Sequence, residues 1–271
     1  PYMTPFRSFS GTFTMSTLSN PSIFKDLTLS PTMTTNTTES LLTVGGTFGS
    51  MSSKFGGIVK ANDGRMFVIP NNVDYFTIID PTTDTVSTTT FGIDLTAANK
   101  WLGGILADNG KIYALPLALD KILIIDPANN TAITSSMGAT IDTSADKWQG
   151  ICKASNGKIY GIPKNASVAI IIDPANDTAT TTDFGLDLSA ADKWYECVVG
   201  TNGKIYSIPR TSDTVLIIDT NNDTAVLTNF GLDLSGSSKW IGGVLASNGK
   251  IYTGPSWSDK SLIINTADDT A

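Results

Sequence analysis

The sequence alternates short apolar segments with turn-forming residues, a pattern that predicts β-strands throughout. In the unit that begins at Trp194, residues 197–200 and 204–208 flank Asn202-Gly203, so we expect a hairpin closed by a type I′ turn. Residues 215–219, VLIID, are apolar on both faces and predict a buried third strand. A turn rich in Asn and Asp and a Thr-rich fourth strand complete the unit.

The same unit occurs five times, and each copy begins with a Lys-aromatic pair. The aromatic residues follow one another at intervals of 46 or 47 residues, at Phe55, Trp101, Trp148, Trp194 and Trp240. Four antiparallel strands repeated at this period are typical of the blades of a β-propeller. Glycines such as Gly57 and Gly103 fall on the first strand of most units, which predicts that this strand lies innermost, where blades converge.

The expected fold is therefore an all-β propeller, with five four-stranded blades over residues 38–271 and an N-terminal arm over residues 1–37. The last unit supplies three strands, and residues 38–45, TESLLTVG, match a fourth strand in length. If this segment completes the last blade, the ring closes without an open edge. Alternatively, residues 23–45 form the second half of a further blade, and the chain is part of a six- or seven-bladed ring or an open fragment.

The third and fourth strands also resemble the repeats of a known group of propellers. The segments IIIDPANDTATTTDFG and VLIIDTNNDTAVLTNFG resemble the hairpin of YVTN and YncE-type propeller repeats, and GKIY after a tight turn is shared with kelch-like propellers. The resemblance covers about residues 55–271. It implies an extracellular or surface-associated binding or scaffold protein, and it carries over no catalytic residue.

Composition excludes several classes of function. The net charge of -7 argues against nucleic-acid binding, which depends on clustered Lys and Arg. No apolar run approaches the roughly 20 residues of a membrane helix, so we expect no membrane insertion. Histidine is absent, which removes the commonest general base and zinc ligand. We expect no cofactor, no metal and no enzymatic activity.

The variable loops indicate where a ligand would bind. The Asn-Gly turns and the DPANDT-type turns lie at one end of each blade and are nearly constant. The loops at the other end differ in every unit, and they follow Pro70, Pro116, Pro163, Pro209 and Pro255. Binding residues often lie on such loops. Arg210 and Trp257 belong to two of these loops, and Trp257 lies outside the repeat pattern.

The Lys-aromatic pairs are further candidates for ligand binding. An aromatic ring beside a cation at each blade junction could bind sugars or acidic groups repeatedly. The candidate residues are Lys100, Trp101, Lys147, Trp148, Lys193, Trp194, Lys239 and Trp240. In the alternative interpretation, each aromatic ring packs between adjacent blades while the Lys pairs with a nearby Asp.

Glu196 replaces a glycine that the other units carry at this position. Its carboxylate is therefore expected near the central axis, where it either binds a ligand or is simply solvated.

Acidic residues could act as metal ligands, and cysteines could pair in a disulfide. The recurring Asp94, Asp142, Asp187 and Asp233 lack the dense ligand spacing of a calcium loop and are better explained by capped turns. Cys152 and Cys197 occupy successive positions of their strands and so point to opposite faces, which predicts no disulfide.

These observations favour a non-enzymatic module that binds a glycan or a protein through the loop-rich face, on a cell surface or a virion. One alternative is a structural subunit of an extracellular or viral assembly that docks through its N-terminal arm. Another is a hydrolase or lyase with a pocket of carboxylates or Tyr around Glu196, because a propeller fold does not fix function.

Overall fold

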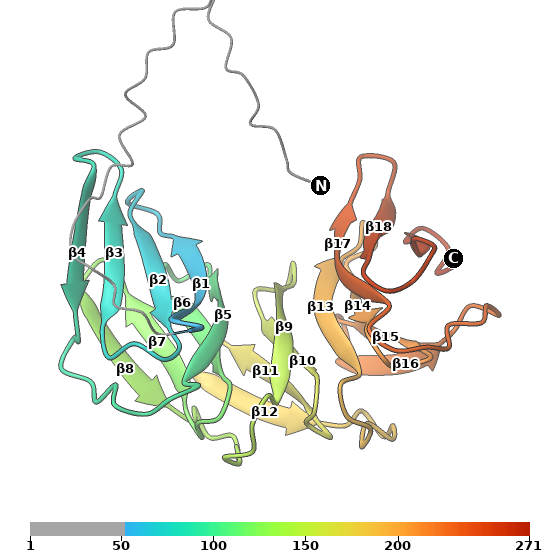
Figure 1. Cartoon of the computed structure of the whole chain (residues 1–271), viewed down its shortest axis with the longest axis horizontal. Helices are drawn as coiled ribbons and strands as arrows, with labels where there is room; N and C mark the ends of the chain where they lie inside the picture. The colour runs from blue at the N-terminus through green and yellow to red at the C-terminus, as the bar shows by residue number, and fades with distance from the viewer. Residues whose placement is uncertain (1–51) are drawn as a thin grey trace, which may run out of the picture. The chain divides into compact units, whose positions relative to one another are not determined.

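The computed structural model describes residues 52–271, which form five antiparallel sheets and no helix (Figure 1). This part of the chain therefore contains no helix that could cross a membrane. The predicted all-β architecture of repeated sheets is confirmed. The predicted arm at residues 1–37 and the predicted strand at residues 38–45 lie outside the described residues.

Each sheet is one blade, and its strands pair in chain order. Blade 1 contains β1 (Phe55–Lys60), β2 (Met66–Pro70), β3 (Phe76–Asp80) and β4 (Thr85–Thr89). Blade 2 contains β5 (Trp101–Leu106), β6 (Ile112–Pro116), β7 (Ile122–Asp126) and β8 (Thr131–Ser135). Blade 3 contains β9 (Trp148–Lys153), β10 (Ile159–Pro163), β11 (Ala169–Asp173) and β12 (Thr178–Thr182). Blade 4 contains β13 (Trp194–Val199), β14 (Ile205–Pro209), β15 (Val215–Asp219) and β16 (Thr224–Thr228), and blade 5 contains β17 (Trp240–Leu245), β18 (Lys250–Pro255) and β19 (Ile263–Asn265).

The turn between the first two strands differs from the predicted type I′ turn. In blade 2, the Gly110 N–H donates to the Ala107 carbonyl at 3.0 Å, and the Ala107 N–H donates to the Lys111 carbonyl at 2.9 Å. Gly110 has a φ of 78°, whereas Asn109 does not adopt positive φ. The loop is thus a type I turn followed by a glycine in the left-handed region, which also matches the twist of a hairpin. Asn109 instead uses its side-chain oxygen to accept from the Lys111 N–H at 3.0 Å.

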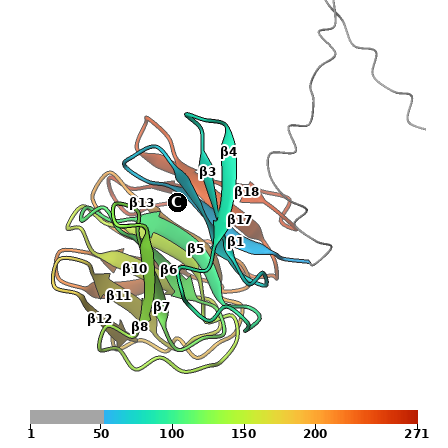
Figure 2. The same cartoon turned by 90° about the vertical axis from the view of Figure 1, so that its left-hand side faces the viewer.

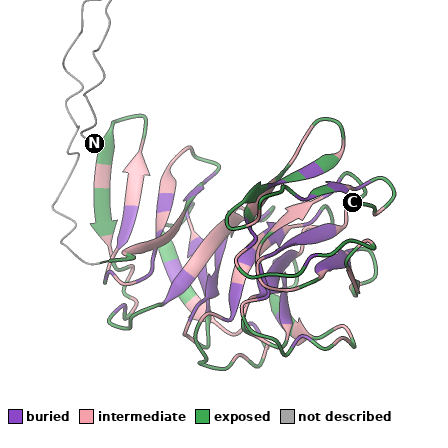
Figure 3. Ribbon diagram, turned by 45° about the vertical axis from the view of Figure 1, so that its right-hand side comes forward, coloured by how far each residue is buried: buried purple, intermediate pink, exposed green. Residues whose placement is uncertain are grey.

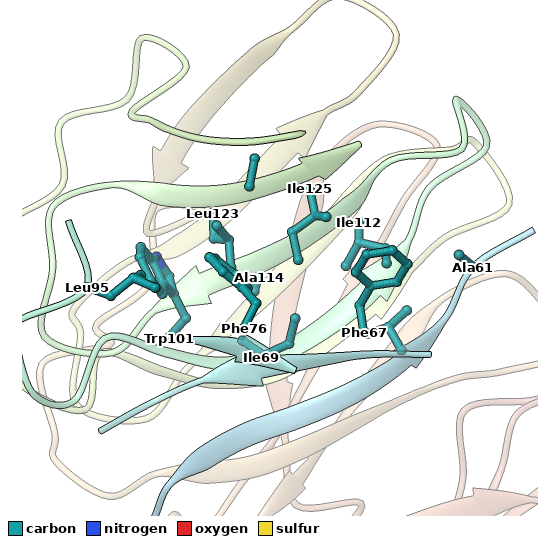
Figure 4. Close-up of a cluster of buried hydrophobic side chains, with 12 residues drawn as sticks. Ala61, Phe67, Ile69, Phe76, Leu95, Trp101, Ile112, Ala114, Leu123 and Ile125 are labelled. Atoms are coloured by element: carbon teal, nitrogen blue, oxygen red, sulfur yellow. The ribbon is translucent and has the colours of Figure 1, made fainter. Parts of the chain in front are cut away.

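Consecutive blades pack face to face and lie side by side in chain order (Figures 1 and 2). Between blades 1 and 2, Phe67 and Phe76 pack against Trp101, Leu123 and other buried residues of the next sheet (Figure 4). Equivalent apolar clusters join blades 2 and 3, 3 and 4, and 4 and 5. Buried residues accordingly concentrate on the strands and exposed residues in the loops (Figure 3).

Glycines allow the first strands to approach one another, as predicted. A Cβ atom on Gly57 would lie 3.4 Å from the backbone of Gly103 in the next blade. A Cβ atom on Gly150 would lie 2.9 Å from the carbonyl carbon of Glu196, closer than real side chains come. The innermost position of these strands therefore depends on the absence of side chains at these residues.

Cys152 and Cys197 form a disulfide bond that joins blades 3 and 4, with their Cα atoms 6.2 Å apart. The prediction that they do not pair was wrong. The two side chains do point to opposite faces of their own sheets, but Cys152 is on the face of blade 3 that meets blade 4. Cys197 is on the face of blade 4 that meets blade 3, so the two opposed faces bring the sulfur atoms together.

Blades 1 and 5 are not joined to each other in the described part of the chain. No hydrogen bond or strand pairing links residues 239–271 to residues 52–90. Their first strands, β1 and β17, do not pack together as β1 packs on β5 or β13 on β17. Within residues 52–271, blade 5 also has three strands where the other blades have four. Closure into a five-bladed ring thus remains a prediction.

Removing the disulfide should destabilise the protein. The bond closes a loop with a sequence separation of 45 residues, and the chain-entropy model gives such a bond about 3–4 kcal/mol. We expect the C152S/C197S variant to lose this amount of unfolding free energy in urea titrations. Dithiothreitol should destabilise the wild type to the same extent and leave the double variant unchanged. A wild type that is insensitive to reduction would contradict the assignment.

Candidate functional site

The Lys-Trp pairs at the blade junctions are buried, and their polar atoms are occupied by backbone carbonyls. Trp101, Trp148, Trp194 and Trp240 are each at most 5% exposed. Every one of these rings lies between two blades and donates its Nε1–H to a carbonyl 20 residues further along the chain. The accepting carbonyls belong to Lys121, Val168, Thr214 and Lys260.

The lysines beside these rings are equally buried, and each ammonium group donates to carbonyl oxygens of the surrounding loops. The Nζ of Lys193 donates to the carbonyls of Lys164 at 3.1 Å, Ala166 at 2.9 Å and Ala190 at 2.5 Å. Equivalent bonds are made by Lys100, Lys147 and Lys239. The alternative interpretation therefore accounts for the aromatic rings, but the expected pairing of each Lys with an Asp is replaced by bonds to carbonyls.

Burial also alters the titration of these lysines. Desolvation lowers the pKa of Lys193 to about 8, while the more distant charge of Asp187 acts in the opposite direction. Desolvation also lowers the pKa values of Lys100, Lys147 and Lys239. The eight Lys and Trp residues thus connect the blades, and two of them, Lys239 and Trp240, also line a pocket of the variable face.

Trp257 differs from the other tryptophans because its side chain is 82% exposed. It lies in the loop between β18 and β19, 17 residues after Trp240. At the same distance from the first aromatic residue, the other blades carry Asn72, Ala118, Asn165 and Thr211. A large aromatic ring therefore replaces a small or polar side chain at this one loop position.

Trp257 borders a pocket of about 660 Å³ between two loops of the variable face. One wall is the connection from blade 4 to blade 5, residues 232–237 with Lys239 and Trp240, and the other is residues 257–262. The indole of Trp240 forms part of the floor, and Leu234 and Leu262 are buried beneath the rim. The pocket thus combines an apolar base with an exposed aromatic ring at its edge.

Backbone hydrogen bonds fix the loop that carries Trp257. The Lys239 carbonyl accepts from the Ser256 N–H at 2.7 Å, and the Ser238 carbonyl accepts from the Trp257 N–H at 3.1 Å. The Trp240 Nε1–H holds the far end of the loop through the Lys260 carbonyl at 2.7 Å. The exposed indole therefore stands on a backbone that is tied to the blade junction at both ends.

The polar groups of the pocket include both signs of charge. Asp259 and Lys260 line it, and their charged atoms have no hydrogen-bond or ion-pair partner within residues 52–271. Asp233 accepts from the Ser235 N–H at 3.0 Å, and bonds from Ser235 lower the pKa of its carboxyl group. An aromatic ring with nearby carboxylate and ammonium groups can stack on a sugar and bind its hydroxyls.

The corresponding loops of blade 2 enclose a smaller pocket of about 230 Å³. Asp94, Asp120 and Lys121 line it at the positions of Asp233, Asp259 and Lys260. The two pockets differ in two respects: the blade 2 loop has no Trp, and Thr134 of the fourth strand lines one side of the smaller pocket. No strand of blade 5 in residues 52–271 takes the place of this wall.

Glu196 lines a separate cavity of about 290 Å³ between the first strands of the blades. One of its carboxylate oxygens lies 2.7 Å from where a Cβ atom on Gly242 would be, so Gly242 makes room for it. Among residues 52–271, no second ionisable side chain lines this cavity, since Cys197 is in the disulfide. Acid-base chemistry usually needs such a partner.

Arg210 is part of a different polar cluster on the variable face. Its guanidinium donates to Asp192 Oδ1 at 2.7 Å and lies 5.3 Å from the centre of the Tyr195 ring. The structure therefore does not bring Arg210, Glu196 and Trp257 into one site, because each belongs to a different set of contacts.

The repeated aspartates of the blade connections act in turns. Asp94, Asp142, Asp187 and Asp233 each accept a hydrogen bond from the N–H two residues later. Within residues 52–271, no three His, Cys, Asp or Glu side chains are grouped closely enough to hold a metal ion. Hydrogen bonding in the turn explains why Asp recurs at this position.

The exposure of Trp257 predicts the fluorescence behaviour of the protein. Acrylamide should quench mainly Trp257, because the other four tryptophans are buried. We expect the W257F variant to lose most of the quenchable fluorescence in Stern–Volmer measurements. W240F is the matched control and should retain it, since Phe55 shows that the fold accepts Phe at this position of a blade. Equal quenching of W257F and the wild type would contradict the exposed position.

The buried Lys193 predicts a dependence of stability on pH. Because its pKa falls from 10.5 to about 8 on folding, the unfolded chain binds more protons between these values. The free energy of unfolding should therefore rise from pH 8 to pH 10, by about 2 kcal/mol. The rise should be smaller in K193M and unchanged in the exposed control K60M, as measured by urea unfolding. Parallel pH profiles of the wild type and K193M would rule this out.

Comparisons with known proteins bear on the fold. The sequence matches no protein-family model, and no curated protein matches it. Virginiamycin B lyase from Staphylococcus aureus superposes with a TM-score of 0.62 at 12% identity, over 80% of this chain and 69% of the lyase. Hydrazine synthase from Kuenenia stuttgartiensis superposes with a TM-score of 0.55 at 16% identity, over 82% of this chain and 66% of that chain.

The extracellular domain of BT3049 from B. thetaiotaomicron is similar as well, with a TM-score of 0.54 at 13% identity. The match covers 78% of this chain and 27% of that chain. Likenesses at this identity show the fold, an all-β propeller of repeated sheets. The specific resemblance to YVTN, YncE or kelch-like repeats stays a prediction.

Proposed function

We propose that this propeller is a non-enzymatic extracellular module that binds a glycan through the pocket bordered by Trp257. The observation that carries the proposal is an indole that is 82% exposed on a loop held at both ends by backbone hydrogen bonds. Exposing such an apolar ring has a cost in water that ligand binding would offset. Because the backbone that carries the ring is already held by hydrogen bonds, binding would have to order only the side chain, which limits the loss of conformational entropy.

The chemistry of the pocket supports a sugar as the ligand. The ring offers a flat apolar face for stacking, while Asp259, Lys260 and Asp233 offer acceptors and donors for hydroxyl groups. The buried Trp240 beneath supplies an apolar floor. A protein ligand is the second candidate, because an exposed aromatic residue is also a common anchor of protein interfaces.

An enzymatic role is less well supported by the side chains. One similar structure is a lyase, and another is a variant of that lyase made catalytically inactive by replacing a histidine with alanine. This chain contains no histidine. Its axial cavity has Glu196 as the one ionisable group within the described residues.

An extracellular location agrees with two observations. Disulfides such as the bond between Cys152 and Cys197 persist mainly in oxidising compartments. One similar propeller is the extracellular domain of a bacterial protein. We therefore propose a secreted or cell-surface protein. A virion is not included in the proposal.

A glycan array probed with the wild type and W257A tests the proposal. We expect the wild type to bind a defined class of glycans and W257A to bind it at least tenfold more weakly, since a stacked aromatic ring supplies more than 1 kcal/mol. T211A alters the corresponding loop position of blade 4 and is the matched control, which should bind like the wild type. Unchanged binding by W257A would refute the assignment of the site. No binding to any glycan would refute the ligand class.

A further inference from the structure

Each blade is tied to the next by polar contacts at the end where the constant turns lie. Between blades 3 and 4, the Lys158 ammonium and the Tyr160 hydroxyl both donate to the Asp223 carboxylate at 2.5 Å. Asp223 is in the turn between β15 and β16 and has a φ of 54°. We call this arrangement the Lys-Tyr/Asp contact: blade n supplies Lys and Tyr, and blade n+1 supplies Asp.

The same contact recurs between blades 4 and 5, where Lys204 and Tyr206 donate to the Asp269 carboxylate. An Asn of the first turn also donates across successive interfaces, including that of blades 2 and 3, where Lys111, Tyr113 and Asp177 occupy the same positions but form no such contact within residues 52–271. Asn156 Nδ2 donates to the Thr220 carbonyl at 2.6 Å, and Asn109 Nδ2 donates to the Pro174 carbonyl at 3.1 Å.

The first interface uses a matched variant of this contact. Blade 1 has Arg65 and Phe67 in place of Lys and Tyr, and blade 2 has Asn130 in place of Asp. The Arg65 guanidinium donates to Asn130 Oδ1 and to the Pro127 carbonyl, each at 2.6 Å. The blade that lacks the Tyr hydroxyl is thus followed by the blade that lacks the carboxylate.

Both halves of a Lys-Tyr/Asp contact are left without a partner in residues 52–271. Blade 5 presents Lys250 and Tyr252, and the Tyr252 hydroxyl accepts only from Asn248 of its own turn, at 3.0 Å. Blade 1 presents Asp84, whose φ of 52° matches that of Asp223 and whose carboxylate has no partner among residues 52–271. Lys250 and Tyr252 on blade 5 and Asp84 on blade 1 therefore complement each other in charge and in hydrogen bonding.

The apolar surface beside these groups is also uncovered. Tyr252 is 39% exposed, whereas Tyr113, Tyr160 and Tyr206 are fully buried at the same position of their blades. Val244 and Ile263 of blade 5 are 71% and 42% exposed. On blade 1, Ile58 is 56% exposed, and its equivalent Gly104 faces the preceding blade. The outward faces of blades 1 and 5 therefore expose apolar residues that a neighbouring blade covers in the other blades.

We propose that blade 5 of one chain docks on blade 1 of a second copy of this chain, through a Lys-Tyr/Asp contact between Lys250 and Tyr252 of the first and Asp84 of the second. The contact continues an interface that the chain already uses between its own blades. A second copy is the occupant because blade 1 of the same chain is not packed against blade 5. Such an interface joins two different surfaces, so the assembly is head to tail. This inference does not depend on the proposed function.

Sedimentation velocity of the full chain over a range of concentrations tests this inference. We expect the wild type to form dimers and larger species as concentration rises. D84N keeps a residue that tolerates positive φ, and K250E reverses the charge on blade 5, so each should weaken association at least about tenfold. D120N and K121E make the same changes on the variable loop of blade 2 and should associate like the wild type.

Mixing the two variants gives the sharpest outcome. The D84N chain retains an intact blade 5 and the K250E chain retains an intact blade 1, so the mixture should form a dimer and nothing larger. A wild type that stays monomeric at all concentrations would overturn the proposal. So would association that persists in both variants. If the wild type is monomeric and each variant is less stable to urea, Asp84 pairs with Lys250 of its own chain, which also overturns docking of a second copy.

Discussion

A sheet with two apolar faces cannot be stable alone, and this constraint shapes the whole molecule. The middle strands of blades 2, 3 and 4 are buried on both sides because a neighbouring sheet covers each face. The Trp of each later blade fills the gap at one end of the interface. Its buried Lys partner gathers the loop carbonyls that would otherwise be unpaired. The stability of one blade is therefore largely the stability of its contacts with two others.

The same constraint leaves the loops at the ends of the blades as the segments whose side chains can vary most freely. Side chains at the core positions pack between blades, and side chains of the constant turns form the polar contacts between blades. The loops between the second and third strands are held mainly by backbone hydrogen bonds, so their side chains can differ from blade to blade. Trp257 illustrates this freedom, because its backbone is held like that of its neighbours while its ring is exposed to solvent.

Much of this fold follows from sequence alone, because the spacing from Trp101 to Trp148, Trp194 and Trp240 records a repeated interface. Trp257 was also identifiable, since it lies outside that spacing. The pairing of Cys152 with Cys197 was not, because it depends on which face of each sheet meets the next blade, and spacing within one strand does not contain this information. The burial of Lys193 was missed for a related reason: its acceptors are carbonyl oxygens, which every residue possesses.

The Asp in the turn between the third and fourth strands matters both for the backbone conformation of the turn and for the contact with the preceding blade. Its positive φ limits the position mainly to Asn, Asp and Gly, and at the last two interfaces its carboxylate also accepts from the Lys and Tyr of the preceding blade. Five near-identical repeats in one chain risk pairing out of order while they fold, as multidomain repeat proteins often do. The Asn130 variant allows the first interface to be distinguished from the later ones, so a single turn residue can help to keep the blades in sequence order during folding.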